Sequence, residues 1–154
     1  MEKIRTVWIG KNKFKALDNL EKEYEYKIRR IIPFKIHLIQ KSSKNYSERK
    51  LLSEEGKNIL KSISKDDFLI LLDEKGEEFN SLGFSKFLNE KINFSKRISF
   101  VVGSFSGVSE EIKQRADFKL SLSKMTFSNY ISRIVLLEQI YRAITLIKGI
   151  EYHR

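Results

Sequence analysis

Three short stretches of the chain have the composition of ligand-binding loops, and each directly follows a run of apolar residues. The first is Leu72 with Asp73-Glu74-Lys75-Gly76, the second is Gly103-Ser104-Phe105-Ser106-Gly107, and the third is Ser123-Lys124-Met125-Thr126-Phe127. If the apolar runs are parallel strands, these stretches meet beyond their carboxyl ends, where open α/β sheets bind ligands. Glycine also lets the backbone approach a ligand closely. We therefore expect the three stretches to form one small-molecule site.

The glycine-containing stretch does not match the common phosphate-binding motifs. No Gly-Lys-Ser/Thr follows it, as a P-loop requires, and the first expected strand–helix turn, Gly10-Lys11-Asn12, lacks the G-x-G-x-x-G dinucleotide pattern. Glycines after strands are more often simple turn residues. Taken alone, this stretch is a weak indication of a binding site.

Metal and thiol chemistry are not expected. The chain has no cysteine, which excludes a disulfide framework, a Cys-ligated zinc site and a thiol nucleophile. Its two histidines, His37 and His153, are far apart and lack metal-ligand spacing. We also expect a cytoplasmic protein without membrane association, because the first residues lead into a strand pattern and no apolar run approaches about 20 residues.

The net charge of +10 is concentrated in the first part of the chain. Residues 1–65 contain 17 Lys or Arg and 8 Asp or Glu, whereas residues 66–154 contain 13 and 12. A localised basic surface favours a polyanion such as nucleic acid. A lysine-rich surface that merely contacts solvent has the same pattern, so charge alone leaves both interpretations open.

The apolar pattern predicts an α/β fold with a mostly parallel sheet of five to six strands and helices on both faces. Five apolar runs alternate with segments of helical periodicity, which is typical of this class. The third and fourth runs are nearly continuous, as expected for strands covered on both faces. The expected strands are 4–9, 34–39, 68–72, 98–102 and 118–122, and the expected helices are 13–30, 47–62, 81–92, 109–116 and about 131–148.

The last expected helix is apolar on much more than one face. Its polar residues, including Glu138 and Arg142 at i,i+4 spacing, form only a narrow row. Such a helix must be buried on nearly all sides. It is either the central helix of a monomer or a contact between two copies of the chain, and we favour the homodimer.

The C-terminal third carries a resemblance to a known family. Residues 121–143 read Ser-Leu-Ser-Lys-Met-Thr-Phe-Ser-Asn-Tyr-Ile-Ser-Arg-Ile-Val-Leu-Leu-Glu-Gln-Ile-Tyr-Arg-Ala, and the chain closes with Gly-Ile-Glu-Tyr-His-Arg. With Glu54-Glu55-Gly56 and residues 72–76, these segments resemble the large-subunit ribosomal RNA methyltransferase H family of the SPOUT superfamily. The resemblance covers residues 1–154 as a single domain. It implies S-adenosylmethionine-dependent methylation of N3 of a pseudouridine in 23S rRNA.

The resemblance also implies where the site lies. The family's fold has a C-terminal trefoil knot whose loops bind S-adenosylmethionine, and its members form homodimers through the last helix. Arg142, Tyr152, His153 and Arg154 match positions that the family associates with the RNA substrate and with catalysis. The positions that match donor contacts are Leu72, Gly103, Leu122, Ser123, Lys124, Met125, Thr126 and Phe127.

Two positions depart from the family's pattern. Ser104 stands where the family usually has a second glycine, and its side chain would either crowd the donor or point away. Asn129 stands where a histidine is common, and an amide cannot act as a base near neutral pH. We interpret both changes as tolerated.

The matched tail residues suggest a mechanism. The imide N3 becomes a good nucleophile when it loses its proton, and methyl transfer then depends mainly on alignment. His153 would accept that proton or orient the pseudouridine ring, while Arg142 and Arg154 would stabilise negative charge on the carbonyl oxygens that flank N3. Alternatively, His153 lies in a frayed terminus and Arg142 only pairs with Glu138.

Two other functions remain open. One is a SPOUT methyltransferase acting on another RNA, for instance on a ribose of transfer RNA. The other is a non-catalytic RNA- or ribosome-binding homologue that lost donor binding through Ser104 and Asn129. Four basic residues of the expected second loop and helix would contact rRNA phosphates, or only solvent: Lys41, Lys44, Arg49 and Lys50.

Overall fold

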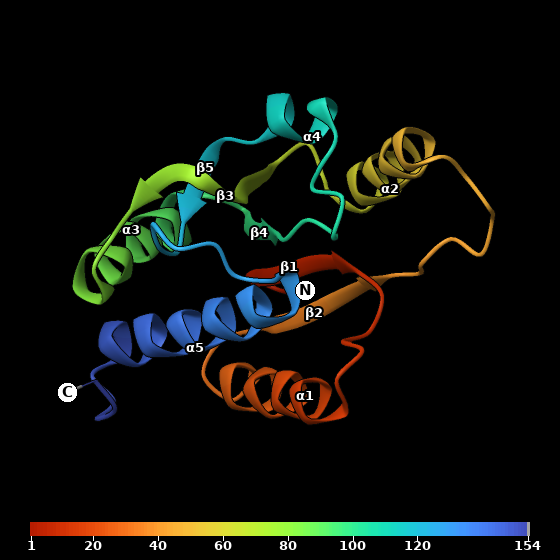
Figure 1. The fold of residues 1–154 in the computed structure, drawn as a ribbon. Coiled ribbons are helices and arrows are strands. Elements are labelled where there is room, and N and C mark those ends of the chain that lie inside the picture. The colour runs from red at the N-terminus through yellow and green to blue at the C-terminus, as the bar shows by residue number, and fades with distance from the viewer. Residues whose placement is uncertain (154) are drawn as a thin grey trace.

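The computed structural model describes residues 1–153, which form ten alternating strands and helices (Figure 1). The elements are β1 (Ile4–Ile9), α1 (Lys15–Arg29), β2 (Phe34–Ile39), α2 (Glu48–Ser62), β3 (Asp67–Glu78), α3 (Ser81–Phe94), β4 (Arg97–Val101), α4 (Glu110–Arg115), β5 (Phe118–Ser121) and α5 (Asn129–Lys148).

The five strands form one sheet in the order β2-β1-β4-β3-β5, and every pair is parallel. Ile4, for example, pairs with Phe34 on one side and with Ile98 on the other. Parallel neighbours need a crossover connection, and a helix lies between each two consecutive strands. The expected α/β class with a parallel sheet is confirmed.

Helices cover both faces of the sheet, as expected. One face packs against α1, α3 and α5 in a large apolar cluster that includes Trp8 and Phe100. The other face packs against α2 and α4 in a smaller cluster that includes Val7, Leu69 and Val101. Alternate residues of each strand therefore enter different clusters, as the pleat requires. Burying each large apolar side chain contributes roughly 1.5–3 kcal/mol.

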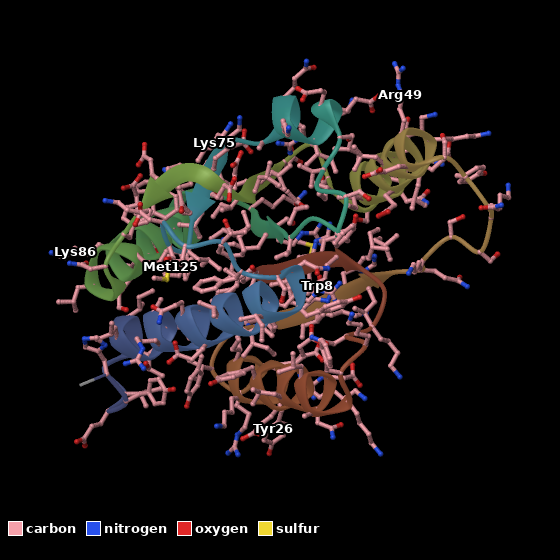
Figure 2. The ribbon with its side chains drawn as sticks, viewed as in Figure 1. Trp8, Tyr26, Arg49, Lys75, Lys86 and Met125 are labelled. Carbon is pink, nitrogen blue, oxygen red and sulfur yellow. The ribbon has the colours of Figure 1, made fainter. Side chains whose placement is uncertain are left out.

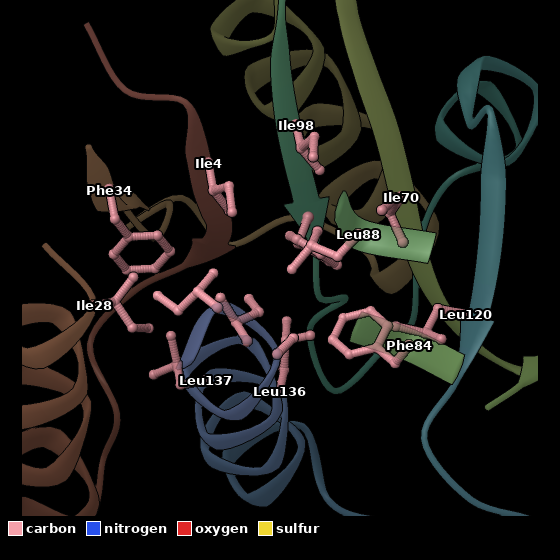
Figure 3. Close-up of a cluster of buried hydrophobic side chains, with 14 of the residues drawn as sticks. Ile4, Ile28, Phe34, Ile70, Phe84, Leu88, Ile98, Leu120, Leu136 and Leu137 are labelled. Atoms are coloured by element: carbon pink, nitrogen blue, oxygen red, sulfur yellow. The ribbon is translucent and has the colours of Figure 1, made fainter. Parts of the chain in front are cut away.

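The last helix lies between α1 and α3 across one face of the sheet (Figure 1). Leu136 and Leu137 point from it into the large cluster (Figure 3). Its N-cap Ser128 accepts a hydrogen bond from the Ile131 amide, and the helix ends at Gly149, whose φ of 67° suits glycine. No helix within residues 1–153 is long and apolar enough to cross a lipid bilayer.

The third strand corrects one expectation. We expected it to end at Leu72, with residues 73–76 as a loop, but β3 continues to Glu78. Leu72 and Glu77 both pair with Leu120, so the residues between them form a bulge against the edge strand β5. Gly76 allows this close approach, because a Cβ there would lie 2.5 Å from the carbonyl oxygen of Lys119. The polar composition therefore reflects an irregular outer part of the strand rather than its end.

Candidate active site

A single chain segment, residues 122–128, crosses the carboxyl edge of the sheet. It leaves β5 after Ser121 and reaches the start of α5, which is anchored at the carboxyl end of β1. Since β4 and β3 lie between β1 and β5 in the sheet, the segment passes the ends of both (Figure 1). This segment contains the third of the stretches that we expected to bind a ligand.

The anchor at the end of β1 is Arg133, a residue that the sequence analysis did not single out. Its guanidinium donates hydrogen bonds to the carbonyl oxygens of Gly10, at 2.9 Å, and Ile9, at 2.8 Å. The side chain is 1% exposed and lies against the Trp8 ring, with 5.1 Å between the guanidinium carbon and the ring centroid. Five donors in a planar fork suit an arginine to this task. Arg133 thus fixes the far end of the crossing segment.

The Arg133 guanidinium faces a buried carboxyl group. Glu21 of α1 lies 3.9 Å away, and burial raises the pKa of Glu21 to about 7 although the arginine opposes this shift. Burial also lowers the pKa of Arg133. The only sequence signal for this cluster was an arginine on a helix face that is otherwise apolar.

The stretch after β4 folds into a tight turn. Ser104 and Gly107 exchange two backbone hydrogen bonds of 3.2 and 2.9 Å, and Gly107 has a φ of 87°. A Cβ on Gly103 would lie 2.9 Å from the carbonyl oxygen of Gly107, so this position requires glycine. The Ser104 hydroxyl lies 3.5 Å from Oε1 of Glu55 in α2. Ser104 is therefore turned toward α2, which covers the face of the sheet opposite α5.

The expected donor residues lie close together along this edge. Leu72 of β3 and Leu122 both pack against the large apolar cluster. The Thr126 hydroxyl donates a 2.9 Å hydrogen bond to Glu74, which ties the crossing segment to the β3 bulge. Within the segment, the Met125 amide donates to the Ser123 hydroxyl at 2.9 Å. The remaining side chains, those of Lys124, Met125 and Phe127, are exposed, and Figure 2 shows Met125 near α3 and α5.

A cavity of about 340 Å³ adjoins this edge, between the end of β5, the start of α3 and α5. Leu122 lines it, together with Phe79, Ser81, Val135 and Gln139. Apolar walls with a few polar groups are typical of small-molecule sites. The residues present fit an adenosine-type donor, because a tight glycine turn and the irregular backbone of residues 123–126, outside any helix or strand, offer amide and carbonyl groups next to apolar side chains.

The expected catalytic residues form a second cluster, beside the second half of α5. Glu138 accepts hydrogen bonds from Arg142 Nε at 3.1 Å, Arg142 Nη2 at 2.7 Å and the Tyr152 hydroxyl at 3.1 Å. Arg142 Nη1 lies 3.1 Å from Nδ1 of His153. The tail therefore packs against its own helix. Arg154 lies outside the described residues.

The Glu138 carboxylate influences the protonation of Arg142 and Tyr152. The hydrogen bonds to Glu138 raise the pKa of Arg142. Burial, together with the hydrogen bond to Glu138, raises the pKa of Tyr152 to about 12. At neutral pH Tyr152 therefore keeps its proton and donates, while Arg142 stays cationic but is paired with a carboxylate.

The two clusters do not meet within one chain. The crossing segment enters the first turn of α5, where Asn129 lies, whereas the tail packs against Glu138 and Arg142 further along the helix. Arg142 lies 13 residues beyond Asn129, which is about 20 Å along the helix axis. The chain therefore brings Leu72 and the crossing segment together, and it brings Arg142, Tyr152 and His153 together as a separate group, while Gly103 lies in the turn after β4.

Comparison with known proteins identifies the family. The family described as predicted SPOUT methyltransferase matches residues 2–153. This chain belongs to that family. Three relatives named ribosomal RNA large subunit methyltransferase H span nearly the whole chain. The protein from Christiangramia forsetii is 42% identical and covers 97% of this chain and 98% of its own; that from Parabacteroides distasonis is 42% identical and covers 98% of each. The relative from Caldicellulosiruptor bescii is 37% identical and covers 98% of this chain and 99% of its own.

Membership in the SPOUT methyltransferase family assigns methyl transfer to this enzyme and confirms the resemblance of the C-terminal segments. Within residues 1–153, no three His, Cys, Asp or Glu side chains are close enough together to hold a metal ion. The sequence analysis missed Arg133, which anchors the crossing segment. It named Glu138 as the partner of Arg142 but did not find its hydrogen bond to Tyr152 of the tail.

Proposed function

We propose that this SPOUT methyltransferase transfers a methyl group from S-adenosylmethionine to N3 of a pseudouridine in the 23S rRNA of the large ribosomal subunit. The observation that carries the proposal is the crossing segment, in a chain whose full length matches proteins named ribosomal RNA large subunit methyltransferase H. The basic excess in residues 1–65 supports an RNA substrate. The whole chain, 1–154, would act as one cytoplasmic domain.

Eight residues along the carboxyl edge would hold the donor, which supplies a methyl group already activated by its sulfonium. The backbone of the crossing segment would grip the adenosine, and the close turn at Gly103 would leave room for it. Family membership further implies that the crossing segment is threaded as a trefoil knot. The proposed donor residues are Leu72, Gly103, Leu122, Ser123, Lys124, Met125, Thr126 and Phe127.

A homodimer would complete the site, because Arg142 lies 13 residues, or about 20 Å of helix, beyond Asn129, where the crossing segment enters α5. An antiparallel partner helix would place the partner's tail beside the donor loops. The outward row of α5 supports this contact, since Ile131 is 41% exposed and Ile134 and Val135 are only partly buried. Apolar residues in such a row are typical of a subunit interface.

The tail residues would bind and orient the imide. Arg142 donates to His153, so we assign the orienting role to His153, whose other ring nitrogen would donate to a carbonyl oxygen next to N3. Tyr152, Arg142 and Arg154 would supply further donors that stabilise negative charge on these oxygens. The N3 proton would leave to solvent, because the Nε2 atom of His153 carries a proton and has no free lone pair.

Methylation of ribosomes that lack the modification tests the proposal. Mass mapping of nucleosides in large-subunit RNA, with and without the enzyme, should find one new methyl group on a pseudouridine N3. If the enzyme instead methylates the ribose of a transfer RNA, the proposed substrate is wrong and the alternative RNA substrate is correct. Calorimetry with S-adenosylmethionine provides the control for binding, because no heat at millimolar donor would favour a non-catalytic RNA-binding homologue.

A further inference from the structure

A second cavity, also of about 340 Å³, lies under the segment of residues 40–47 that joins β2 to α2. Figure 1 shows this segment extending from the end of β2 before it returns to α2. The volume of the cavity falls within the range of about 300–1,000 Å³ that is usual for ligand pockets. Residues of the segment and of α2 line it, including Gln40, Lys41, Ser42, Tyr46, Glu55 and Asn58.

This pocket, which we call the β2–α2 pocket, is adjacent to the proposed donor site. Glu55 in its wall lies 3.5 Å from the hydroxyl of Ser104, the residue that follows Gly103. Lys41 in its rim approaches Gly10 at the end of β1. The pocket and the donor turn therefore share the carboxyl edge of the sheet, where a substrate has to meet the donor.

The wall of the pocket holds a buried carboxyl group without a full set of partners. Glu55 is 8% exposed, and its Oε2 has no hydrogen-bond partner among residues 1–153. Burial raises the pKa of Glu55, although Ser104 and Lys41 oppose this shift. A buried polar atom that lacks a partner costs roughly 1–3 kcal/mol. Oε2 itself is buried, so a ligand in the pocket does not reach this atom unless the Glu55 side chain moves.

The rim of the pocket combines an aromatic ring with cations. Tyr46 is half-buried, and the ammonium groups of Lys50 and Lys44 lie 4.6 and 5.7 Å from its ring centroid. Single-stranded RNA is bound by such sets, because bases stack on aromatic rings while lysines neutralise phosphates. A site that bound only phosphate would not need the aromatic ring, and a site for an apolar ligand would not need the lysines.

We propose that the β2–α2 pocket receives the nucleotide that accepts the methyl group. Tyr46 stacks on the unpaired pyrimidine base and Lys44 and Lys50 contact the flanking phosphates, so that the imide edge stays free for the donor and the tail residues. This inference rests on the proposed function, because it places the acceptor of that reaction. It assigns the first docking of the target to a basic segment of the N-terminal half rather than to the C-terminal tail.

The test measures ribosome binding and donor binding separately. Ribosomes without the modification are titrated with labelled wild-type enzyme, Tyr46→Ala, Tyr46→Phe and Lys86→Ala, and the Kd for S-adenosylmethionine is measured by calorimetry for each. Stacking of one base is worth about 1–3 kcal/mol, so Tyr46→Ala should weaken ribosome binding roughly 5- to 150-fold. Tyr46→Phe keeps the ring and should bind nearly as wild type. The control Lys86→Ala removes an exposed charge of α3, seen in Figure 2, and should have little effect.

The outcomes separate the two proposals. Lys44→Ala should weaken binding and lower the slope of log affinity against log salt by about one, as expected for one phosphate contact. Unchanged ribosome affinity in both Tyr46→Ala and Lys44→Ala, with wild-type donor binding, would overturn the pocket proposal and leave methylation intact. Absence of donor binding or of methylation in the wild-type enzyme would instead overturn the proposed function itself.

Discussion

The guanidinium of Arg142 lies 3.1 Å from Nδ1 of His153. Arginine N–H groups only donate, so Nδ1 must accept with its lone pair. A neutral imidazole carries one proton, which must then be on Nε2. The histidine therefore presents a donor, and no free lone pair, on its side away from Arg142. The structure thus favours the orienting role among the two that the sequence left open for His153.

Substitution of His153 tests this assignment. His153→Ala should lower methylation roughly 10²- to 10³-fold, as loss of one donor to a developing negative charge does elsewhere. His153→Gln can place an amide N–H at the same end and should recover part of this loss, although it has no titratable group. Initial rates on unmodified ribosomes, together with the oligomeric state by light scattering, measure both effects. A His153→Ala enzyme with full activity would remove this residue from the mechanism.

Glu138 holds the tail that we propose to be catalytic, since it accepts hydrogen bonds from both Arg142 and Tyr152. A hydrogen bond to a charged group contributes about 1.5–3 kcal/mol. Glu138→Gln should therefore lower kcat by roughly 10- to 100-fold while the Kd for S-adenosylmethionine stays unchanged. Glu90→Gln, the same substitution at an exposed position of α3, is the matched control. Equal kcat in the two variants would show that Glu138 does not hold the tail in its working position.

Arg133 should contribute strongly to stability. Removal of one partner from a buried ion pair costs about 3–5 kcal/mol, and Arg133→Met also leaves the carbonyl groups of Ile9 and Gly10 without their donors. The free energy of unfolding, from urea titration, should fall by that amount. Arg49→Met serves as the control, because Arg49 is exposed and Figure 2 shows it pointing away from the protein. Donor binding by Arg133→Met should weaken as well, if the start of α5 holds the crossing segment in place.

Glu21 should make stability depend on pH. Its pKa is raised by burial to about 7 in the folded chain, from 4.5. Between these values the folded state binds more protons than the unfolded state, so this contribution is fully present below about pH 4.5 and is lost as the pH rises through about 7. The loss is at most about 3 kcal/mol. Subtracting the unfolding profile of Glu21→Gln from that of the wild type isolates it, and a flat difference between pH 4 and 8 would contradict the expectation.

The order of strands and helices was predictable because each strand is a short apolar run between two helical segments. The near-continuous run of β4 correctly indicated a strand covered on both faces. The end of β3 was not predictable, since Asp73 to Gly76 have turn-forming composition and only the neighbouring strand β5 turns them into a bulge. Local sequence does not contain that partner.

The site was predictable to a different degree in its two parts. The loops at the carboxyl edge could be found because parallel strands place their ends together. The buried contacts of Arg133 and Glu55 could not, because an arginine or a glutamate in a helix is usually exposed, and its partners here come from distant segments. The direction of the Ser104 side chain likewise depends on α2, which lies about fifty positions earlier in the chain.

The hydrogen bond from the Arg133 guanidinium to the Gly10 carbonyl oxygen joins two residues that are 123 positions apart in the chain. A contact of such long range closes late, since the intervening chain has to be ordered first. During synthesis, β1 is made long before α5, and a single domain generally folds as one unit. The crossing segment therefore cannot take up its final position before α5 has been made and Arg133 has bound the end of β1. Truncation or stalling near the C-terminus would thus leave the large apolar cluster uncovered on one face of the sheet, in a chain prone to aggregation.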